Sequence, residues 1–244
     1  MIKTAKVASK IWRRCAVTKS DDSFLNVVFM DLPRDRTEDL VDFHMTQYVP
    51  RELTYMISGL PKNKDAMKEY REIIQEKLSN PTNSTIICCQ EKNDKIIPDI
   101  IGSDTMKLVK RGDPVEDEIP PHLKTKEARD YLRILRDWNN LFPVPDILEK
   151  FDLDCFYDDL GVGVHENFSG YGIVHHLVGL RRNICQANGV PMTGAWTTSI
   201  GTEKAAHRTG WEQVYEISRE DINKVLNIKH ESNVSSYKYF ILRA

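Results

Sequence analysis

Residues 168–173, with the sequence FSGYGI, form the stretch whose composition best suits ligand chemistry. Gly170 and Gly172 lack side chains, so the chain can turn sharply there and its backbone amides stay uncovered. Amides in the first turn of a helix have no partner within that helix, and the helix dipole adds partial positive charge. If a helix starts at this turn, the sequence predicts a binding site for an anion such as phosphate.

Two well-known phosphate-binding motifs do not fit this turn. The dinucleotide fingerprint G-x-G-x-x-G requires a third glycine, and His175 occupies that position. A P-loop requires a lysine followed by serine or threonine after the glycines, and no such pair follows Gly172. The turn therefore indicates neither a dinucleotide-binding protein nor a P-loop nucleotidase.

The flanking residues predict the two elements that position the turn. Residues 160–164 alternate apolar side chains with glycine, which is the two-residue period of a strand. After the turn, apolar residues recur every three or four positions, as in an amphipathic helix, at Ile173, Leu177, Leu180 and Ile184. A strand, a glycine turn and a helix thus follow one another, with the bare amides at the helix start.

This stretch resembles the acyl-CoA signature of the GCN5-related N-acetyltransferase (GNAT) superfamily, V-x-x-x-x-R/Q-x-x-G-x-G/A. Val164 and Gly172 match with the family's spacing, whereas Ser169 replaces the Arg or Gln and Val174 replaces the last small residue. The resemblance implies that the turn binds the diphosphate of acetyl-CoA and that the strand edge pairs with its pantetheine arm. The cofactor-binding residues that it implies are Val162, Gly163, Val164, Ser169, Gly170, Tyr171, Gly172, Ile173, Val174 and His175.

Two further regions narrow the resemblance to the insect arylalkylamine N-acetyltransferase-like (dopamine N-acetyltransferase-like) branch. The run DLPRDR at residues 31–36 matches that branch, and Glu52 falls on the acidic residue that is the catalytic base in its characterised members. Leu53 departs from the pattern, because a proline usually follows the acid. Residues 195–218 resemble the branch almost throughout, and Trp12 matches a tryptophan near the start of those chains.

The resemblance implies catalytic roles for three residues. Glu52 would take a proton from an ammonium so that the amine can attack the thioester directly. Thr198 and Thr202 stand where related enzymes carry serine hydroxyls thought to assist proton movement and thiol release. Ala206 replaces the superfamily's frequent tyrosine acid, so the thiol, with a pKa of about 8.5, would leave as a thiolate. From the residues alone, Glu52 fits better a solvated carboxylate beyond a helix end, and Thr198, Ser199 or Thr202 could cap the helix that follows.

Composition limits the class of protein. The 244 residues carry 34 basic and 36 acidic side chains, a balance that does not attract nucleic acid. The first 15 residues lack a signal-peptide core, and no apolar run is long enough to span a bilayer. Five cysteines without a C-x-x-C pair support neither a disulfide framework nor a zinc site. Composition therefore favours a single-domain cytoplasmic protein without a metal, nucleic-acid or membrane partner. The resemblance implies a small amine and an acyl-CoA as partners, and we expect a monomer.

The resemblance also implies the fold class, which is α/β (α+β) with the GNAT architecture. We expect one mixed, mostly antiparallel sheet of about seven strands with helices on both faces, whose central strands at Val162 and Ala195 splay apart to admit the cofactor. The predicted strands are residues 26–31, 84–90, 98–109, 160–164, 192–198, 212–218 and 235–242. The predicted helices are residues 37–45 with Thr37 as cap, 62–79, 126–141, 173–188 and 203–209. The helix at 126–141 either covers the acceptor pocket, as in the insect branch, or is an exposed connection.

The function that the resemblance implies is acetyl-CoA-dependent N-acetylation of an arylalkylamine such as dopamine, tyramine, serotonin or tryptamine. Two alternatives stay open. The changes at Ser169 and Val174 are consistent with a weakened or inactive protein that keeps the fold as a binding or regulatory module. The second alternative is an acyltransferase for a different acceptor, a polyamine or agmatine, or for a different donor, a longer acyl-CoA.

Overall fold

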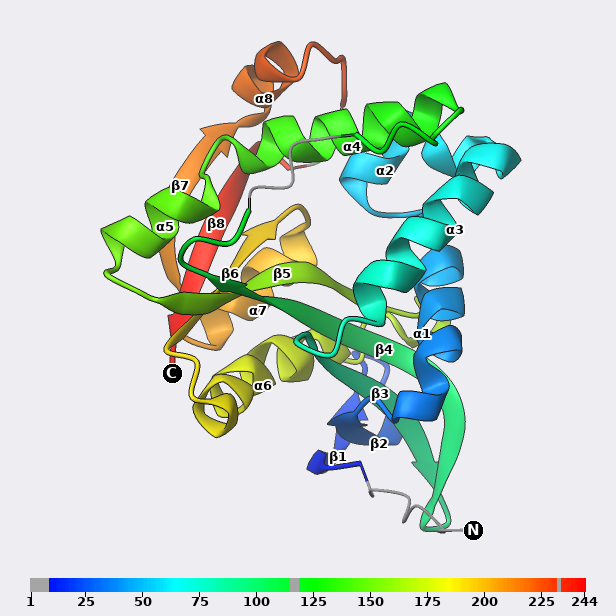
Figure 1. Ribbon diagram of the computed structural model, residues 1–244. Coiled ribbons are helices and arrows are strands. Elements are labelled where there is room, and N and C mark those ends of the chain that lie inside the picture. The colour runs from blue at the N-terminus through cyan, green and yellow to red at the C-terminus, as the bar shows by residue number, and fades with distance from the viewer. Residues whose placement is uncertain (1–8, 115–118, 232–233) are drawn as a thin grey trace, which may run out of the picture.

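The structure is a computed structural model that describes residues 9–114, 119–231 and 234–244. One sheet of eight strands runs through these residues (Figure 1). The first eight residues of the amino-terminal segment tested above for a signal peptide lie outside these ranges. The strand order is β1-β2-β3-β4-β5-β6-β8-β7. The strands are β1 (Ile11–Thr18), β2 (Phe24–Asp31), β3 (Ser84–Lys92), β4 (Lys95–Lys110), β5 (Cys155–Val164), β6 (Met192–Thr197), β7 (Glu212–Ser218) and β8 (Ser236–Arg243).

The sheet opens between β5 and β6. These two strands are parallel and pair at Tyr157 and Thr193, whereas the other neighbouring strands described here are antiparallel. Past that pair β5 also bulges, because Asp159 pairs with Met106 and Gly161 with Thr105, leaving Leu160 as an extra residue. The predicted fold class, with its splayed central strands, is therefore confirmed.

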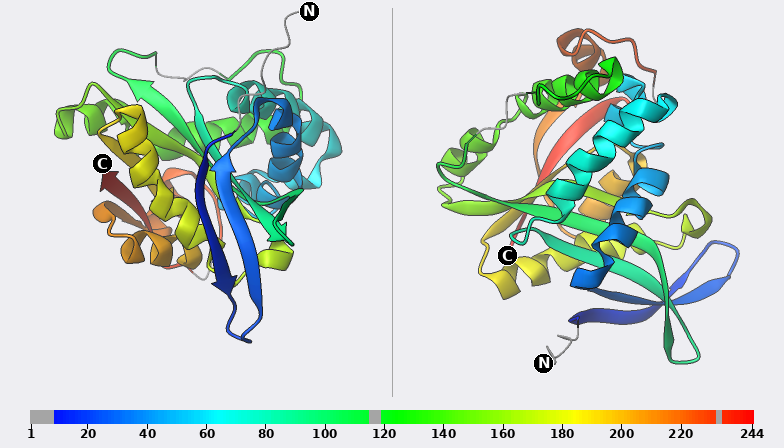
Figure 2. Two further views of the ribbon diagram at one scale, coloured as in Figure 1. Left: turned by 90° about the horizontal axis from the view of Figure 1, so that it is seen from below. Right: turned by 45° about the vertical axis from the view of Figure 1, so that its right-hand side comes forward.

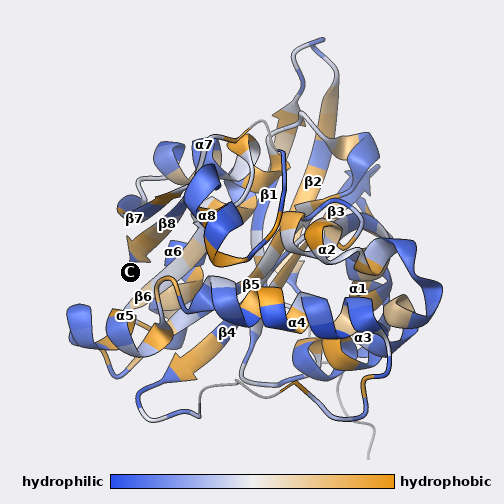
Figure 3. Cartoon of the chain, turned by 90° about the horizontal axis from the view of Figure 1, so that it is seen from above, coloured by the Kyte–Doolittle hydropathy of each residue, from blue (hydrophilic) through white to orange (hydrophobic). Residues whose placement is uncertain are grey.

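Helices cover both faces of the sheet. The first face carries α1 (Thr37–Phe43), α2 (Leu53–Ser58), α3 (Lys64–Leu78), α4 (Lys126–Asn139), α5 (Val144–Lys150) and α8 (Arg219–Val225). The second face carries α6 (Ile173–Asn188) and α7 (Ile200–Arg208). Figure 2 shows α6 on the opposite side of the sheet from α1 and α3. Apolar residues are concentrated in the strands, while the helices alternate apolar and polar segments (Figure 3).

Most predicted elements are present, and the differences have local causes. All seven predicted strands exist; β1 was missed because it is an edge strand whose residues are mostly exposed. Thr37 is wrong as a cap, since it is the first residue of α1 and its hydroxyl donates to the carbonyl of Arg34 at 3.3 Å. The helix predicted at 62–79 starts later, because the extended Asn63 caps α3 with its side chain. The short helices α2, α5 and α8 were not predicted.

A buried ion group ties α6 to the sheet beside the opening. The Arg181 guanidinium contacts Asp104 on β4, with Nε 2.8 Å from Oδ2, and also contacts Asp159 on β5. Arg181 and Asp104 are 1 % and 0 % exposed, so neither charge is solvated by water. Burial alone would lower the pKa of Arg181, but the two carboxylates raise it above its ordinary value. Arg181 therefore stays charged and holds both strands.

On the first face, a tyrosine side chain from β8 crosses β6 and reaches β5 where the opening begins. Tyr239 of β8 lies over Gly194 of β6 and donates to Asp158 Oδ1 on β5 at 3.3 Å. Burial, followed by the charge of Asp159, raises the pKa of Asp158 to about 6. Asp158 and Asp159 thus hold β5 from opposite faces of the sheet, which fixes the point at which β5 and β6 begin to diverge.

Gly194→Ala tests this crossing. A Cβ at position 194 would lie 2.2 Å from the Tyr239 hydroxyl oxygen, and Tyr239 is buried, so its ring has little room to move. We expect urea unfolding to show a loss of about 1–3 kcal/mol. The control Gly201→Ala meets nothing closer than 3.8 Å and should unfold like the unchanged protein. An unchanged urea midpoint for Gly194→Ala would contradict the crossing.

Candidate functional site

A cavity of about 210 Å³ lies at the amino end of α6. All of the predicted cofactor-binding residues except Tyr171 and His175 line it, so the structure brings together a set that the sequence spreads over thirteen positions. Phe168, Ser199 and Gly201 also line it and were not predicted. The lining residues are Val162, Gly163, Val164, Phe168, Ser169, Gly170, Gly172, Ile173, Val174, Ser199, Gly201 and Thr202.

The glycine turn has the geometry that an anion site requires. Gly170 and Gly172 have φ values of +87° and +74°, which L side chains rarely adopt, and Gly172 is the N-cap of α6. Among the described residues, the backbone amides of 170–174 donate to no acceptor, whereas the His175 amide donates to the Gly172 carbonyl at 3.0 Å. The turn therefore offers unpaired donors at the start of a 16-residue helix.

Tyr171 and His175 hold the turn from outside the cavity. The Tyr171 hydroxyl lies 2.9 Å from Ser23 Oγ in the connection between β1 and β2. His175 turns Nδ1 into a buried position, where it has no hydrogen-bond partner among the described residues. Both side chains thus support the turn and do not form its inner wall.

The start of α7 forms the facing wall. Ser199 is the N-cap, and its Oγ accepts from the Thr202 amide at 3.2 Å and lies 2.9 Å from Thr202 Oγ1. Thr202 lines the cavity, while Thr198 is partly buried and lines neither this cavity nor the next. The structure therefore brings Thr202 to the site, and it gives the capping role weighed for the threonines to Ser199.

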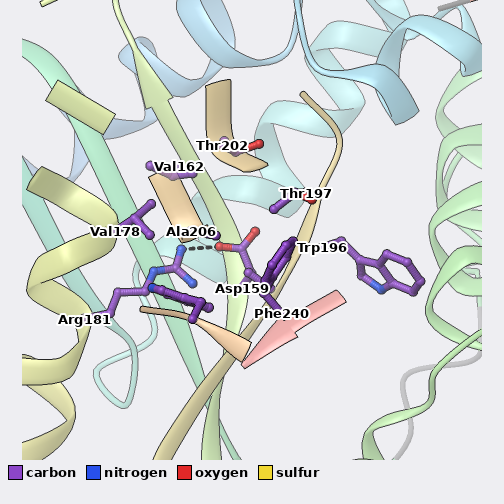
Figure 4. A pocket seen from close by; sticks show the side chains of 11 residues that line it. Asp159, Val162, Val178, Arg181, Trp196, Thr197, Thr202, Ala206 and Phe240 are labelled. Atoms are coloured by element: carbon purple, nitrogen blue, oxygen red, sulfur yellow. Dashed lines mark hydrogen bonds and ion pairs between the residues drawn. The ribbon is translucent and has the colours of Figure 1, made fainter. Parts of the chain in front are cut away.

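A second, smaller cavity of about 20 Å³ lies between the diverging β5 and β6 (Figure 4). It shares Val162 and Thr202 with the first cavity, so the two form one track from the glycine turn inward. Its volume suits about one water molecule. Asp159 and Arg181 lie at its wall. Their buried ion pair was not predicted, because a pair between residues distant in the sequence leaves no motif. The other lining residues are Val178, Ala195, Trp196, Thr197, Ala206, Trp211 and Phe240.

The edge of β5 facing the opening keeps free backbone groups. The His165 amide bonds to the Ile101 carbonyl at 2.9 Å, and Gly163 pairs with Ser103 on β4. Since bonding directions alternate along a strand, the backbone groups of Val162 and Val164 point toward β6. Arg51 Nη2 already donates to the Val164 carbonyl at 2.9 Å. Val162 and the Val164 amide are the groups left for a ligand that adds as a strand.

Glu52 lies on the first face of the sheet. Its amide donates to the Tyr48 carbonyl at 3.0 Å, and the Tyr48 ring covers Gly161 and Gly163 of β5, where a Cβ at Gly161 would lie 2.9 Å from the Tyr48 hydroxyl. Glu52 itself lines neither cavity described above. The strand β5 thus separates the glycine-turn track from the Glu52 side.

The Glu52 carboxylate is partly buried and caps α2. Its Oε2 accepts from the Thr54 amide at 2.8 Å, the Thr54 hydroxyl at 2.5 Å and the Tyr55 amide at 3.4 Å. Among the described residues no donor bonds Oε1. Burial raises the pKa of Glu52 above its ordinary value, and the Thr54 and Tyr55 bonds oppose that rise. One oxygen is therefore fixed by the cap, and the other can accept a proton.

A buried aromatic group supports this segment. His44 Nε2 lies 3.2 Å from the Tyr55 hydroxyl, which also contacts the Tyr70 hydroxyl, and the Tyr55 and Tyr131 rings stack at 4.3 Å. Burial lowers the pKa of His44 to about 3, so it is neutral at physiological pH. Tyr131 belongs to α4, which therefore packs on α2 and is not an exposed connection.

Neither a metal centre nor a membrane span emerges from the described part of the chain. No three His, Cys, Asp or Glu side chains within it are grouped so that they could hold a metal ion. No helix described here combines the length and the apolar character needed to cross a bilayer.

Comparisons with known proteins give a match through structure. No family model matches the chain, and no curated protein matches it. A solved structure of the putative arylalkylamine N-acetyltransferase 7 of the mosquito Aedes aegypti is similar over 100 % of this chain and 98 % of its own, with a TM-score of 0.79 and 19 % identity.

Two further solved structures are similar over 89 % of this chain. Arylalkylamine N-acetyltransferase 2 of Aedes aegypti has a TM-score of 0.69 at 13 % identity, with 98 % of its own chain covered. The Drosophila melanogaster polyamine N-acetyltransferase, described as forming N-acetylagmatine, has a TM-score of 0.66 at 15 % identity, with 100 % of its own chain covered. The resemblance predicted from the sequence is thus confirmed at the level of the fold: the chain has the GNAT fold, in the form found in insect arylalkylamine N-acetyltransferases.

Proposed function

We propose that this protein is an acetyl-CoA-dependent N-acetyltransferase whose acceptors are arylalkylamines of the dopamine, tyramine, serotonin and tryptamine class. The observation that carries the proposal is that the bare amides of the glycine turn border a cavity that adjoins the gap between β5 and β6. An anion site at the turn and an unpaired strand edge beside it suit the diphosphate and the narrow pantetheine chain of a coenzyme A thioester. The fold comparisons support the same reaction class.

The residues present fit such a donor. Unpaired amides at 170–174 would bind the diphosphate oxygens, helped by the positive end of α6. The backbone edge at Val162 and Val164 would pair with the amides of the pantetheine arm. The Val164 amide would stabilise negative charge on the reacting carbonyl oxygen, because a fixed amide needs no reorganisation. Bound acetyl-CoA supplies the acetyl group as a thioester.

Glu52 would take the proton that the acceptor ammonium must lose, directly or through a water. Its open Oε1 and raised pKa suit a base at neutral pH, since a stronger base removes protons more readily while remaining ionised. The amine would then attack the thioester without an acyl-enzyme. The Thr202 hydroxyl lies at the wall of both cavities and donates to the Ser199 carbonyl at 3.0 Å, so it would have to turn from that bond to donate to the departing sulfur. A role for Thr198 would require it to move into the track.

An aromatic acceptor fits the side of β5 that carries Glu52. Tyr48 is partly buried against the glycines of β5, four residues before Glu52, and offers a ring face to an aryl group. A polyamine acceptor is the second candidate, favoured by the fold similarity to the Drosophila polyamine enzyme and by the carboxylate of Asp158 on the same face. Thiol release measured with tyramine, serotonin, spermidine and agmatine would separate the two.

Glu52→Gln tests the base. We expect turnover with tyramine at pH 7 to fall about 100-fold or more, because a general base contributes at least that factor. Coenzyme A binding, measured by calorimetry, should be unchanged, since Glu52 lies on the other side of β5. Glutamine is also a weaker cap, so α2 should lose about 1 kcal/mol, and melting curves would separate this effect. Normal turnover by Glu52→Gln would remove Glu52 from its role.

Thr54→Val provides a finer test through pH. Glu52 acts ionised, so turnover should decline as pH falls through its pKa. The Thr54 hydroxyl bond lowers that pKa, so its loss should move the acidic limb of the pH-rate profile to higher pH. Thr54→Ser keeps the hydroxyl and is the matched control. An acidic limb that stays in place in Thr54→Val would mean that another group titrates.

Val174→Trp tests the donor site. Val174 lines the 210 Å³ cavity without filling it, and an indole there would occupy the space. We expect calorimetry to show loss of coenzyme A binding, with Val174→Ala binding like the unchanged protein or more tightly. Val225→Trp, at a site 51 % exposed, controls for the added ring. Coenzyme A binding by Val174→Trp at normal affinity would exclude this cavity as the donor site.

A further inference from the structure

The glycine turn has no cation of its own, because Ser169 offers only a hydroxyl at the edge of the cavity. Amides and the helix dipole carry partial charges, whereas a diphosphate carries full negative charges. A full positive charge beside the turn would therefore add affinity, since a hydrogen bond to an ionised donor is about twice as strong as a neutral one.

Lys19, 150 residues earlier in the chain, lies against the turn. It sits where the chain leaves β1, and its stem runs over Gly170: a Cβ at Gly170 would lie 3.4 Å from Lys19 Cε and 3.5 Å from Cγ. Its Nζ is 5.7 Å from the centre of the Tyr171 ring. Lys19 is partly buried by these contacts, so its side chain packs along the turn and does not extend into solvent.

The connection that carries Lys19 is fixed to the turn. The Lys19 amide donates to the Ser23 carbonyl at 2.9 Å, and the Asp22 amide donates back to the Lys19 carbonyl at 3.0 Å. Ser23 Oγ in turn lies 2.9 Å from the Tyr171 hydroxyl. The β1–β2 hairpin and the glycine turn are thus linked by these contacts, which keep the stem of Lys19 beside Gly170.

We propose that the Lys19 ammonium supplies the positive charge for the diphosphate of the bound acyl donor, a charge that Ser169 cannot supply. This inference rests on the proposed function. The last two bonds of the stem can rotate while the part over Gly170 stays packed, so the ammonium can swing over the edge of the turn.

Two other charged residues lie near the turn: Asp21 could pair with Lys19, and Arg51 is a second cation close to the cavity. Asp21 interacts with Lys19, whose charge contributes to lowering the pKa of Asp21 after the Ser23 hydrogen bonds. Asp21 is exposed and already bonded to Ser23. An anion that the amides of the turn also hold is therefore the better partner for Lys19. Arg51 also lies near the cavity, but its guanidinium bonds the carbonyls of Gln47 and Val164. Arg51 is therefore held at the strand end and away from the turn.

The test is calorimetric titration of coenzyme A and of pantetheine, which lacks the diphosphate. We expect Lys19→Met to weaken coenzyme A binding about tenfold at low salt, the loss of one charge-assisted contact. The difference should shrink as salt rises, because salt screens exposed charges. Pantetheine affinity should not change. Lys19→Arg should bind nearly as tightly as the unchanged protein, and Ser169→Arg should restore affinity to Lys19→Met.

Two variants serve as comparisons. Lys92→Met removes one charge from an exposed position at the end of β3 and should leave coenzyme A binding unchanged. Unaltered affinity in Lys19→Met, or a loss in Arg51→Met in its place, would overturn the role of Lys19 while leaving the proposed function intact. If the unchanged protein binds no coenzyme A, the proposed function fails, and the role of Lys19 fails with it.

Discussion

The parting of β5 from β6 is the constraint on which the rest of the structure depends. The two strands pair at Tyr157 and Thr193 and then diverge, and adjacent aspartates hold β5 at that point from opposite faces. Arg181 binds one of them from α6, and Tyr239 binds the other from β8. Without these contacts the strands could pair further and close the track, because unpaired strand edges tend to find partners.

The same strand divides the chemistry of the site. Val162 and Val164 turn toward α6 and the two cavities, whereas Gly161 and Gly163 turn toward Tyr48 and the Glu52 side. This alternation follows from the period of a strand, in which successive side chains point to opposite faces. Because glycines have no side chains, little more than the backbone of β5 separates the groups proposed to bind the donor from the carboxylate proposed to deprotonate the acceptor.

The sequence could predict what local patterns encode. The glycine turn, the helix after it and seven of the eight described strands follow from periodicity and turn residues, and their resemblance to a known fold linked them into one sheet. Arg181 could not be predicted as a buried residue, because its burial depends on Asp104 and Asp159, which lie far away in the sequence. Ser199 was predicted as a possible helix cap, but its place in the cavity wall was missed, as was Lys19, because both depend on how the hairpin and α7 pack. Thr37 and Asn63 show that helix caps depend on local backbone geometry that several polar residues fit equally.

Glu52 caps α2, and if it is also the proposed base, these two roles have a consequence for the timing of a catalytic cycle. Its negative charge stabilises the first turn of α2 through three hydrogen bonds. A proton captured there neutralises that charge, and the turn then loses its electrostatic anchor until the proton is released to solvent. The segment beside the acceptor would therefore be most loosely held just after the amide has formed, when a finished product has to diffuse away.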